Sequence, residues 1–425
     1  MLYRHFRCNV WKTQDRSIIL KILYFTQFYK PENIAAAFRA SDHSQIWASL
    51  GHEITVFTGW PNYPTGRLYD GYEMTKLAVE NIGGVRIFRS ASKIQPNTSF
   101  KKRIEAGASF IINGLKNLKH DSPVGTDYDV VLVTYGTVFS AWLGVHYAKK
   151  HGLPLVVEFR DLTYKQMIAT GSPATSFKVR AIKALELSFC KSADRIVVLT
   201  KGFRDDLAAE GVEPLRITVV PNGADLVPCN HAWNNCLRFG YFGTMGLSQD
   251  VPVTVKYIGS LAKKGLASSY LLIGEGAARS EVESELTSSS QGFLRLMHGM
   301  PMNELERYYA DVDMTVVSLQ KSDSFAGTIP SKIFQSFARG VPVLYIGPDG
   351  DASNLIRESG AGIVLCGTID EDLETLECFA SRSDLAEELS RMSTSAINFM
   401  EQNYTRKRMA DQMLLSLVGA VKNAN

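Results

Sequence analysis

The chain has 425 residues, a length typical of two or three domains, and it is 45% hydrophobic and 21% charged, the balance of an ordinary globular protein. Its net charge of +3 is too small to indicate a nucleic-acid partner, and its six scattered cysteines form no Cys-x-x-Cys motif or Cys/His cluster, which argues against a zinc site or a disulfide framework. No apolar run reaches the roughly 18 residues that a transmembrane helix needs.

The N-terminal residues 1–17 are rich in basic side chains, namely Arg4, Arg7, Lys12 and Arg16. The apolar run that follows at 18–25 contains Lys21 and has the length of a strand, which does not fit the apolar core of a signal peptide. We therefore expect 1–17 to be a loose N-terminal extension.

Strand-like and helix-like segments alternate in the first half of the chain. A strand at 18–25, a helix at 34–50 and a strand at 53–58 form a β-α-β unit of a parallel sheet. The alternation continues with strands at 85–89, 130–134, 155–159, 195–199 and 217–220 and helices at 138–150, 177–190 and 203–210. These segments predict a first doubly wound domain over 18–222.

A second α/β series follows residues 223–236, which we interpret as an interdomain linker because they lack any periodic pattern. Its strands are expected at 237–242, 270–273, 294–297, 314–318, 342–346 and 363–365, and the last helices at about 384–402 and 406–421. The fold class predicted is α/β, with a second doubly wound domain over 237–400 and a cleft between the two domains. Ligands in such sheets bind at the carboxyl ends of the strands.

The stretch Phe325 to Gly340, FAGTIPSKIFQSFARG, has the features of an anion site. Gly327 leaves the backbone bare, and Pro330 and Ser331 suit a helix start. Free N–H groups, the positive end of the helix dipole and the ammonium of Lys332 then coincide, with Gln335 one turn further on. The alternative is an ordinary capped helix that packs its apolar face on a sheet.

Glycine-containing loops follow other strands of the second domain. They are Gly243-Thr244-Met245-Gly246, Gly274-Glu275-Gly276 and the segment at Gly299. One such loop is most simply a tight turn, but several at successive strand ends favour a phosphate-bearing ligand.

Charged residues at two further strand ends are candidates for chemistry. Arg160 and Asp161 end a strand of the first domain, where Asp161 could accept a proton or hold a sugar hydroxyl and Arg160 could meet a phosphate; the alternative is a structural ion pair. Asp311 and Asp313 form an Asp-x-Asp between a helix and a strand, a place that favours helix-ending carboxylates. We therefore predict no bound metal.

Residues 97–120 combine basic and apolar side chains at helical spacing. Lys101, Lys102, Arg103, Lys116, Lys119 and His120 are interleaved with Phe100, Ile104, Phe110, Ile111, Ile112, Leu115 and Leu118. The pattern fits a helix that lies on an anionic membrane surface, or equally a helix with a solvated basic face.

Taken together, the motifs resemble the GT-B-fold glycosyltransferases of family 4, in the bacterial polysaccharide and O-antigen branch, over about residues 18–420. The matching segments are Lys21-Ile22-Leu23-Tyr24, Lys30-Pro31-Glu32, Ala35-Ala36-Ala37 with Arg39, Gly51-His52-Glu53, Thr58-Gly59-Trp60-Pro61-Asn62-Tyr63-Pro64, Arg160-Asp161-Leu162, Ala193-Asp194-Arg195, Val220-Pro221-Asn222-Gly223-Ala224-Asp225, the Gly243 loop, Ile273-Gly274-Glu275-Gly276 and Ile329-Pro330-Ser331-Lys332-Ile333-Phe334.

The resemblance implies retaining sugar transfer from a nucleotide diphosphate sugar, without a metal or other cofactor, and a last helix within 401–425 that crosses back to the first domain. The second domain would bind the donor through Gly243, Thr244, Met245, Gly246, Glu275, Gly299, Gly327, Thr328, Ile329, Ser331 and Gln335. Lys332, Arg160 and Asp161 would be the catalytic residues, and Ala35, Ala36, Arg39 and Asn62 would lie on the acceptor side.

The wider family carries a Glu-x7-Glu signature, where this chain has Gly327 and Gln335. An amide can still bond the donor ribose, with less strength than a carboxylate.

We expect a cytoplasmic enzyme, peripheral on the inner membrane through 97–120, that moves a hexose or N-acetylhexosamine from a UDP-sugar to a polyprenyl-diphosphate-linked oligosaccharide in surface polysaccharide synthesis. The alternatives are a UDP-sugar 2-epimerase of the same architecture and a non-catalytic subunit of a polysaccharide assembly complex. A nicotinamide dehydrogenase is disfavoured because no G-x-G-x-x-G follows the first strand of either domain.

Overall fold

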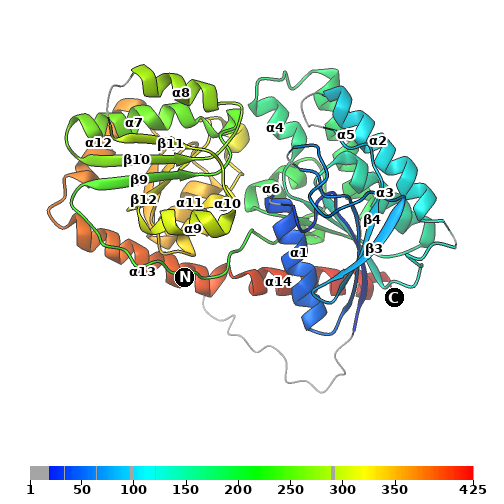
Figure 1. Cartoon of the computed structure of the whole chain (residues 1–425). Helices are drawn as coiled ribbons and strands as arrows, with labels where there is room; N and C mark the ends of the chain where they lie inside the picture. The colour runs from blue at the N-terminus through cyan, green and yellow to red at the C-terminus, as the bar shows by residue number, and fades with distance from the viewer. Residues whose placement is uncertain are drawn as a thin grey trace.

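The computed structural model describes residues 19–424 except 33, 64, 96–99, 120 and 289–291, so the predicted extension at 1–17 lies outside the described residues. Two α/β domains, each built on its own sheet, lie side by side (Figure 1). The predicted α/β fold with two doubly wound sheets is confirmed.

The first domain has an eight-stranded sheet in the order β3-β4-β2-β1-β5-β6-β7-β8. Its strands are β1 (Lys21–Phe25), β2 (Glu53–Gly59), β3 (Leu77–Ile82), β4 (Val85–Ser90), β5 (Val130–Tyr135), β6 (Leu155–Phe159), β7 (Arg195–Val198) and β8 (Ile217–Val219). All neighbours pair in parallel except β3, an antiparallel edge strand that has no counterpart among the predicted elements. Its side chains are at most half-buried, so it lacks the continuous apolar run that marks central strands such as β5.

Helices cover both faces of this first sheet. They are α1 (Ala35–Ser49), α2 (Phe100–Asn117), α3 (Val138–His151), α4 (Thr163–Ala169), α5 (Phe177–Ser192) and α6 (Lys201–Ala209). Helix α3 shows how the sequence sets its own limits: the Thr137 hydroxyl accepts a hydrogen bond from the Ser140 N–H, and Gly152 ends the helix at φ 64°.

The second domain has a six-stranded parallel sheet in the order β11-β10-β9-β12-β13-β14. Its strands are β9 (Leu237–Phe242), β10 (Ala267–Ile273), β11 (Leu294–Met297), β12 (Met314–Ser318), β13 (Val343–Ile346) and β14 (Gly362–Leu365). Its helices are α7 (Val251–Lys263), α8 (Arg279–Ser288), α9 (Met302–Ala310), α10 (Ser331–Phe337), α11 (Asp351–Ser359), α12 (Ile369–Ala380) and α13 (Leu385–Asn403).

The last helix, α14 (Arg406–Ala424), continues from α13 and runs beneath the first domain (Figure 1). Its apolar face, which includes Met409, Met413 and Leu417, is fully buried in a core that contains Tyr24 and Trp47. The indole N–H of Trp47 also donates to the Ala410 carbonyl at 2.9 Å. The end of the chain is thus part of the core of the first domain.

The chain crosses between the domains twice, and the two crossings touch. The Ala224 N–H donates to the Tyr404 carbonyl at 3.1 Å, and a Cβ on Gly223 would lie 2.7 Å from the same oxygen, so only glycine fits there. Arg406 pairs with Asp42 at 3.1 Å and with Asp225 at 3.5 Å. These contacts form the hinge side of the cleft.

A second interdomain contact joins the start of α6 to the segment before α10 and to the first residue of α11. The Thr200 hydroxyl donates to the Gly327 carbonyl at 2.6 Å, and the Gly202 N–H donates to Asp351 Oδ2 at 2.6 Å. A Cβ on Gly202 would lie 2.5 Å from the Gly327 Cα, which is closer than real atoms approach. The absence of side chains at both glycines therefore permits the observed approach of the two domains.

Gly202→Ala is expected to push the domains apart, because the added methyl group meets backbone. Small-angle X-ray scattering should show a larger radius of gyration than for the wild type. The matched control is Gly259→Ala, also within a helix, where the nearest atom to the new Cβ is 3.7 Å away. An unchanged radius of gyration for Gly202→Ala would contradict this role of the glycine pair.

Candidate functional site

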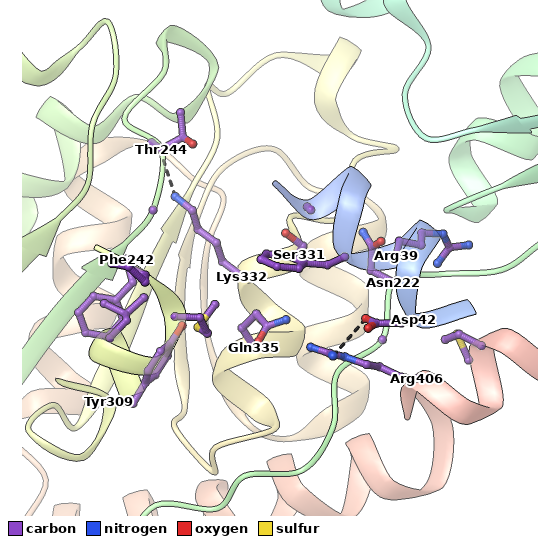
Figure 2. A pocket seen from close by; sticks show the side chains of 18 of the residues that line it. Arg39, Asp42, Asn222, Phe242, Thr244, Tyr309, Ser331, Lys332, Gln335 and Arg406 are labelled. Carbon is purple, nitrogen blue, oxygen red and sulfur yellow. Dashed lines mark hydrogen bonds and ion pairs between the residues drawn. The ribbon is translucent and has the colours of Figure 1, made fainter. Parts of the chain in front are cut away.

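A cavity of about 310 Å³ lies between the two domains, beside the hinge. Figure 2 shows side chains from α1, α10 and α14, together with Asn222 just before the linker, converging on it. The lining residues are Ala35, Phe38, Arg39, Asp42, His43, Asn222, Gly223, Phe242, Gly243, Thr244, Met300, Pro301, Met302, Leu305, Tyr309, Ser331, Lys332, Gln335, Arg406 and Met409.

Lys332 is a cation on the wall of this cavity without a carboxylate partner among the described residues. Its Nζ donates to the Tyr241 hydroxyl and to the Thr244 carbonyl at 3.2 Å, and lies 3.7 Å from the centre of the Tyr241 ring (Figure 2 draws the Thr244 contact). Burial lowers the pKa of Lys332 to about 7. A ligand anion in the cavity would supply the missing negative charge and raise this pKa again.

Gly243 makes room for the Lys332 side chain. Its φ of +122° favours glycine, and a Cβ here would lie 2.9 Å from Lys332 Cε. The Gly243 N–H donates to the Ile273 carbonyl at 2.8 Å, so it does not face the cavity as a free donor.

The other N–H groups of the 243–246 loop are also largely used inside the domain. The Met245 N–H donates to the Glu275 carbonyl at 2.8 Å, and the Gly246 N–H donates to Gln249 Oε1 at 3.0 Å. The Met245 side chain is fully buried in the core. Of the four N–H groups of this loop, these hydrogen bonds leave only that of Thr244 as a candidate for contact with a diphosphate.

The neighbouring glycine loop supports the first one and does not line the cavity. A Cβ on Gly274 would lie 1.9 Å from the Gly243 carbonyl oxygen, so the two loops pack backbone to backbone. Glu275 Oε1 accepts hydrogen bonds from His298 Nδ1 at 2.7 Å and from the Gly299 N–H at 3.3 Å. Glu275 and Gly299 thus lie together at the exposed rim, next to Met300 of the cavity wall.

Of the predicted donor residues around α10, the structure brings Ser331, Lys332 and Gln335 into the cavity and leaves three others outside it. Gly327 lies in the interdomain contact with Gly202, the Thr328 N–H donates to the Phe325 carbonyl at 2.9 Å, and Ile329 packs against the core.

Because α10 has only seven residues, Lys332 and not the helix dipole is the main positive charge at this wall of the cavity.

The orientation of Gln335 depends on two residues that the sequence analysis did not single out. Arg339 donates to Gln335 Oε1 at 3.0 Å and pairs with both carboxylate oxygens of Glu306, at 2.5 Å and 3.0 Å. The amide oxygen of Gln335 is therefore occupied, and its NH₂ group is the part left for a ligand. No local sequence pattern marks this arrangement, since Glu306 comes from a different helix.

On the first-domain side, Ala35 and Arg39 line the cavity, whereas Ala36 is buried and Asn62 lies elsewhere. The Asn62 amide donates to the Trp60 carbonyl at 2.7 Å, and its N–H donates to Glu32 at 3.0 Å. The structure thus places Asn62 as a loop-stabilising residue outside this cavity.

Arg39 uses its guanidinium to tie α1 to the end of the sheet. Nε pairs with the buried Glu158 at 2.7 Å, and the terminal nitrogens donate to the Pro221 and Val220 carbonyls at 2.6 and 2.8 Å. The Thr134 hydroxyl also donates to Glu158 at 2.6 Å. Although burial opposes it, the nearby arginines hold the pKa of Glu158 below its usual range.

Arg160 and Asp161 do not line the cavity, and no ion pair joins them among the described residues. The Arg160 Nε has no hydrogen-bond partner there. Asp161 keeps an exposed surface, but protein atoms crowd around its carboxyl group. The partial loss of water that results raises the pKa of Asp161 to about 6. Their catalytic role stays a prediction.

The Asp-x-Asp motif is structural. Asp311 ends α9 as predicted, and the buried Asp313 pairs with Arg238 at 2.7 Å. In the described part of the chain, no three His, Cys, Asp or Glu residues are grouped to hold a metal ion.

Helix α2 presents an apolar stripe to solvent, although residues 97–99 and 120 lie outside the described residues. Ile104, Ile112 and Leu115 are 43%, 54% and 37% exposed, and Trp142 of the adjacent α3 is 37% exposed. We call these four residues the α2–α3 patch; the exposed Lys116 and Lys119 lie beside it. Within the residues described, no helix is both long and apolar enough to span a bilayer.

Comparisons with known proteins find similarity to glycosyltransferases. Residues 36–223 match a family model described as "Glycosyl transferase 4-like domain". The chain is 21% identical over 419 residues to the putative colanic acid biosynthesis glycosyl transferase WcaI of Escherichia coli K12, covering 94% of this chain and all of WcaI.

Solved structures share the fold at low sequence identity. Sucrose-phosphate synthase from Thermosynechococcus elongatus superposes with a TM-score of 0.73 at 13% identity, covering 96% of this chain and 100% of that one. Anabaena HepE in complex with UDP gives 0.64 at 13% identity (94% and 100% covered), and WaaG gives 0.63 at 15% identity (92% and 98% covered).

Arg39→Ala is expected to destabilise the protein by about 3–5 kcal/mol, because Glu158 is left as an unpaired buried charge. Urea denaturation at pH 7 measures the loss. The double variant Arg39→Ala, Glu158→Gln should recover part of it, since the charge is gone. A loss below about 1 kcal/mol for the single variant would show that this pair is not needed for folding.

Proposed function

We propose that the chain is a family 4 glycosyltransferase of the GT-B fold. It transfers a hexose or N-acetylhexosamine, with retention, from a UDP-sugar to a polyprenyl-diphosphate-linked oligosaccharide in surface polysaccharide synthesis. The observation that carries the proposal is Lys332: an ammonium without an anionic partner in the described structure, on the wall of an interdomain cavity. Such a group is complementary to a diphosphate.

The names of the relatives support this choice of substrates. WcaI is described as a colanic acid biosynthesis enzyme, WaaG as a glycosyltransferase involved in lipopolysaccharide biosynthesis, and HepE has been solved with UDP bound. Polysaccharide assembly and a uridine nucleotide are therefore the first candidates for this chain.

The chemistry asked of Lys332 is charge stabilisation. The bond between C1 of the sugar and the diphosphate oxygen breaks, and its electron pair goes to the diphosphate. The acceptor hydroxyl oxygen then bonds C1 on the same face, and its proton passes to the departing diphosphate oxygen. Lys332, protonated once the diphosphate is bound, stabilises the negative charge as it develops.

Gln335 supplies a second contact to the donor. Since Arg339 occupies its amide oxygen, its NH₂ group donates to ribose oxygens in the place where the wider family uses a carboxylate. A neutral amide also avoids placing another negative charge beside the Arg339–Glu306 ion pair.

The acceptor is a lipid, so the enzyme must work at a membrane surface. The α2–α3 patch places apolar side chains next to Lys116 and Lys119, the combination that binds anionic lipid headgroups and the outer acyl region. We assign the patch to the cytoplasmic face of the inner membrane.

Lys332→Met is expected to raise the barrier to transfer by about 2–4 kcal/mol, the scale for losing one charge-stabilising donor. The assay measures UDP release from a panel of UDP-, GDP- and dTDP-sugars over membrane lipid extract, with product analysis. Near-normal turnover of the variant would contradict the role of Lys332. An epimerised nucleotide sugar formed without acceptor would instead indicate a 2-epimerase.

Membrane binding is tested with Ile112→Glu, Leu115→Glu, which places two charges in the α2–α3 patch. Co-sedimentation with phosphatidylglycerol vesicles should weaken by about tenfold or more, because two partly exposed apolar side chains are lost from the interface. Phe177→Glu on α5 is the control, since Phe177 is 87% exposed but lies outside the patch. Equal binding by wild type and both variants would exclude the patch as the membrane contact.

A further inference from the structure

His43 is a polar residue of the cavity that the proposed chemistry leaves unused. It lies on α1, one turn after Arg39, and lines the cavity although only 3% of its surface is exposed. Its ring packs on Trp47, with centroids 5.5 Å apart. Its Nδ1 is buried and has no hydrogen-bond partner among the described residues.

A buried polar atom without a partner is energetically costly, so it points to a ligand group that would complete its surroundings. Burial, and then the charges of Arg39 and Arg160, hold the pKa of His43 well below its usual range. The imidazole is therefore neutral at physiological pH. In that form it has one donor and one acceptor, which together match a ligand hydroxyl, and it brings no positive charge toward a phosphate.

The position of His43 along the cavity suggests which part of a donor it meets. Figure 2 shows Lys332 pointing toward Thr244 on one side, while Asp42, the residue before His43, lies beyond Gln335 against Arg406. Across the cavity from Asp42, on the other side of Gln335, Figure 2 shows Phe242 and Tyr309 of the second domain; Met300, Met302 and Leu305 also line the cavity, so this wall is apolar. This end therefore fits a planar base and a ribose, while the Lys332 end fits the diphosphate.

We propose that His43 hydrogen-bonds the nucleoside of the donor, so that both domains hold the nucleoside at once. The inference rests on the proposed function, which places the donor in this cavity. The Asp42–Arg406 ion pair at 3.1 Å fixes this part of α1 to α14 next to the hinge.

The test compares UDP with inorganic pyrophosphate as titrants of the full chain. His43→Phe keeps a ring against Trp47 but removes both hydrogen-bonding nitrogens. It should weaken UDP binding about 3- to 10-fold, the scale of one neutral hydrogen bond, and leave pyrophosphate binding unchanged. His43→Gln, which restores a donor and an acceptor, should lose less. His146→Phe is the matched control, because His146 stacks on Trp142 outside the cavity and should change neither affinity.

Two outcomes overturn the inference: unchanged UDP affinity in a folded His43→Phe variant, or a loss seen with a UDP-sugar but not with UDP, which would assign His43 to the transferred sugar. Imidazole nitrogen NMR shifts of wild-type His43 give a readout independent of variant folding, and they should move with UDP and not with pyrophosphate. Lys332→Met separates this result from the proposed function, because its loss of affinity for both titrants is expected whatever His43 does.

Discussion

The site depends on an ammonium group that lies against an aromatic face and has no carboxylate partner in the part of the chain that the structure describes. Lys332 donates to a carbonyl and a hydroxyl and lies over the Tyr241 ring, contacts that orient the side chain without neutralising it. Removing such a charge from water is costly, and the lowered pKa of Lys332 expresses that cost. A diphosphate in the cavity would pair with the Lys332 ammonium. The same charge would therefore both bind the donor and stabilise the leaving diphosphate.

The two domains are arranged so that this group faces a shared cavity. The hinge at Gly223 and Tyr404 and the contact of Gly202 with Gly327 join the domains at separate places, both by backbone approaches that a side chain would prevent. A glycine at position 327 is therefore favoured by the close approach of the two domains. Arg39 then fixes α1 to the end of the first sheet, through Glu158 of β6 and the Pro221 carbonyl that follows β8, and this sets the first-domain wall of the cavity.

Much of this architecture could be predicted from the sequence, because buried parallel strands such as β5 are continuous apolar runs and helix ends carry local signals. The placement of Lys332 after Pro330 and Ser331 follows from the same local logic. The edge strand β3 was missed, since its partly exposed residues lack that pattern. Backbone hydrogen bonds of the 243–246 loop, the Arg339 contact to Gln335 and the burial of His43 depend on residues distant in sequence, so no local motif reports them.

Proton uptake on donor binding tests the central claim most directly. Since burial lowers the pKa of Lys332 to about 7, its amine is largely neutral at pH 8, whereas a neighbouring diphosphate would raise this pKa and keep it charged. Calorimetric titration with UDP-glucose at pH 8, in buffers of different ionisation enthalpy, should therefore show uptake of nearly one proton, and affinity should fall as the pH rises above 7. Lys332→Met should remove this uptake; wild-type binding without proton uptake would contradict the account.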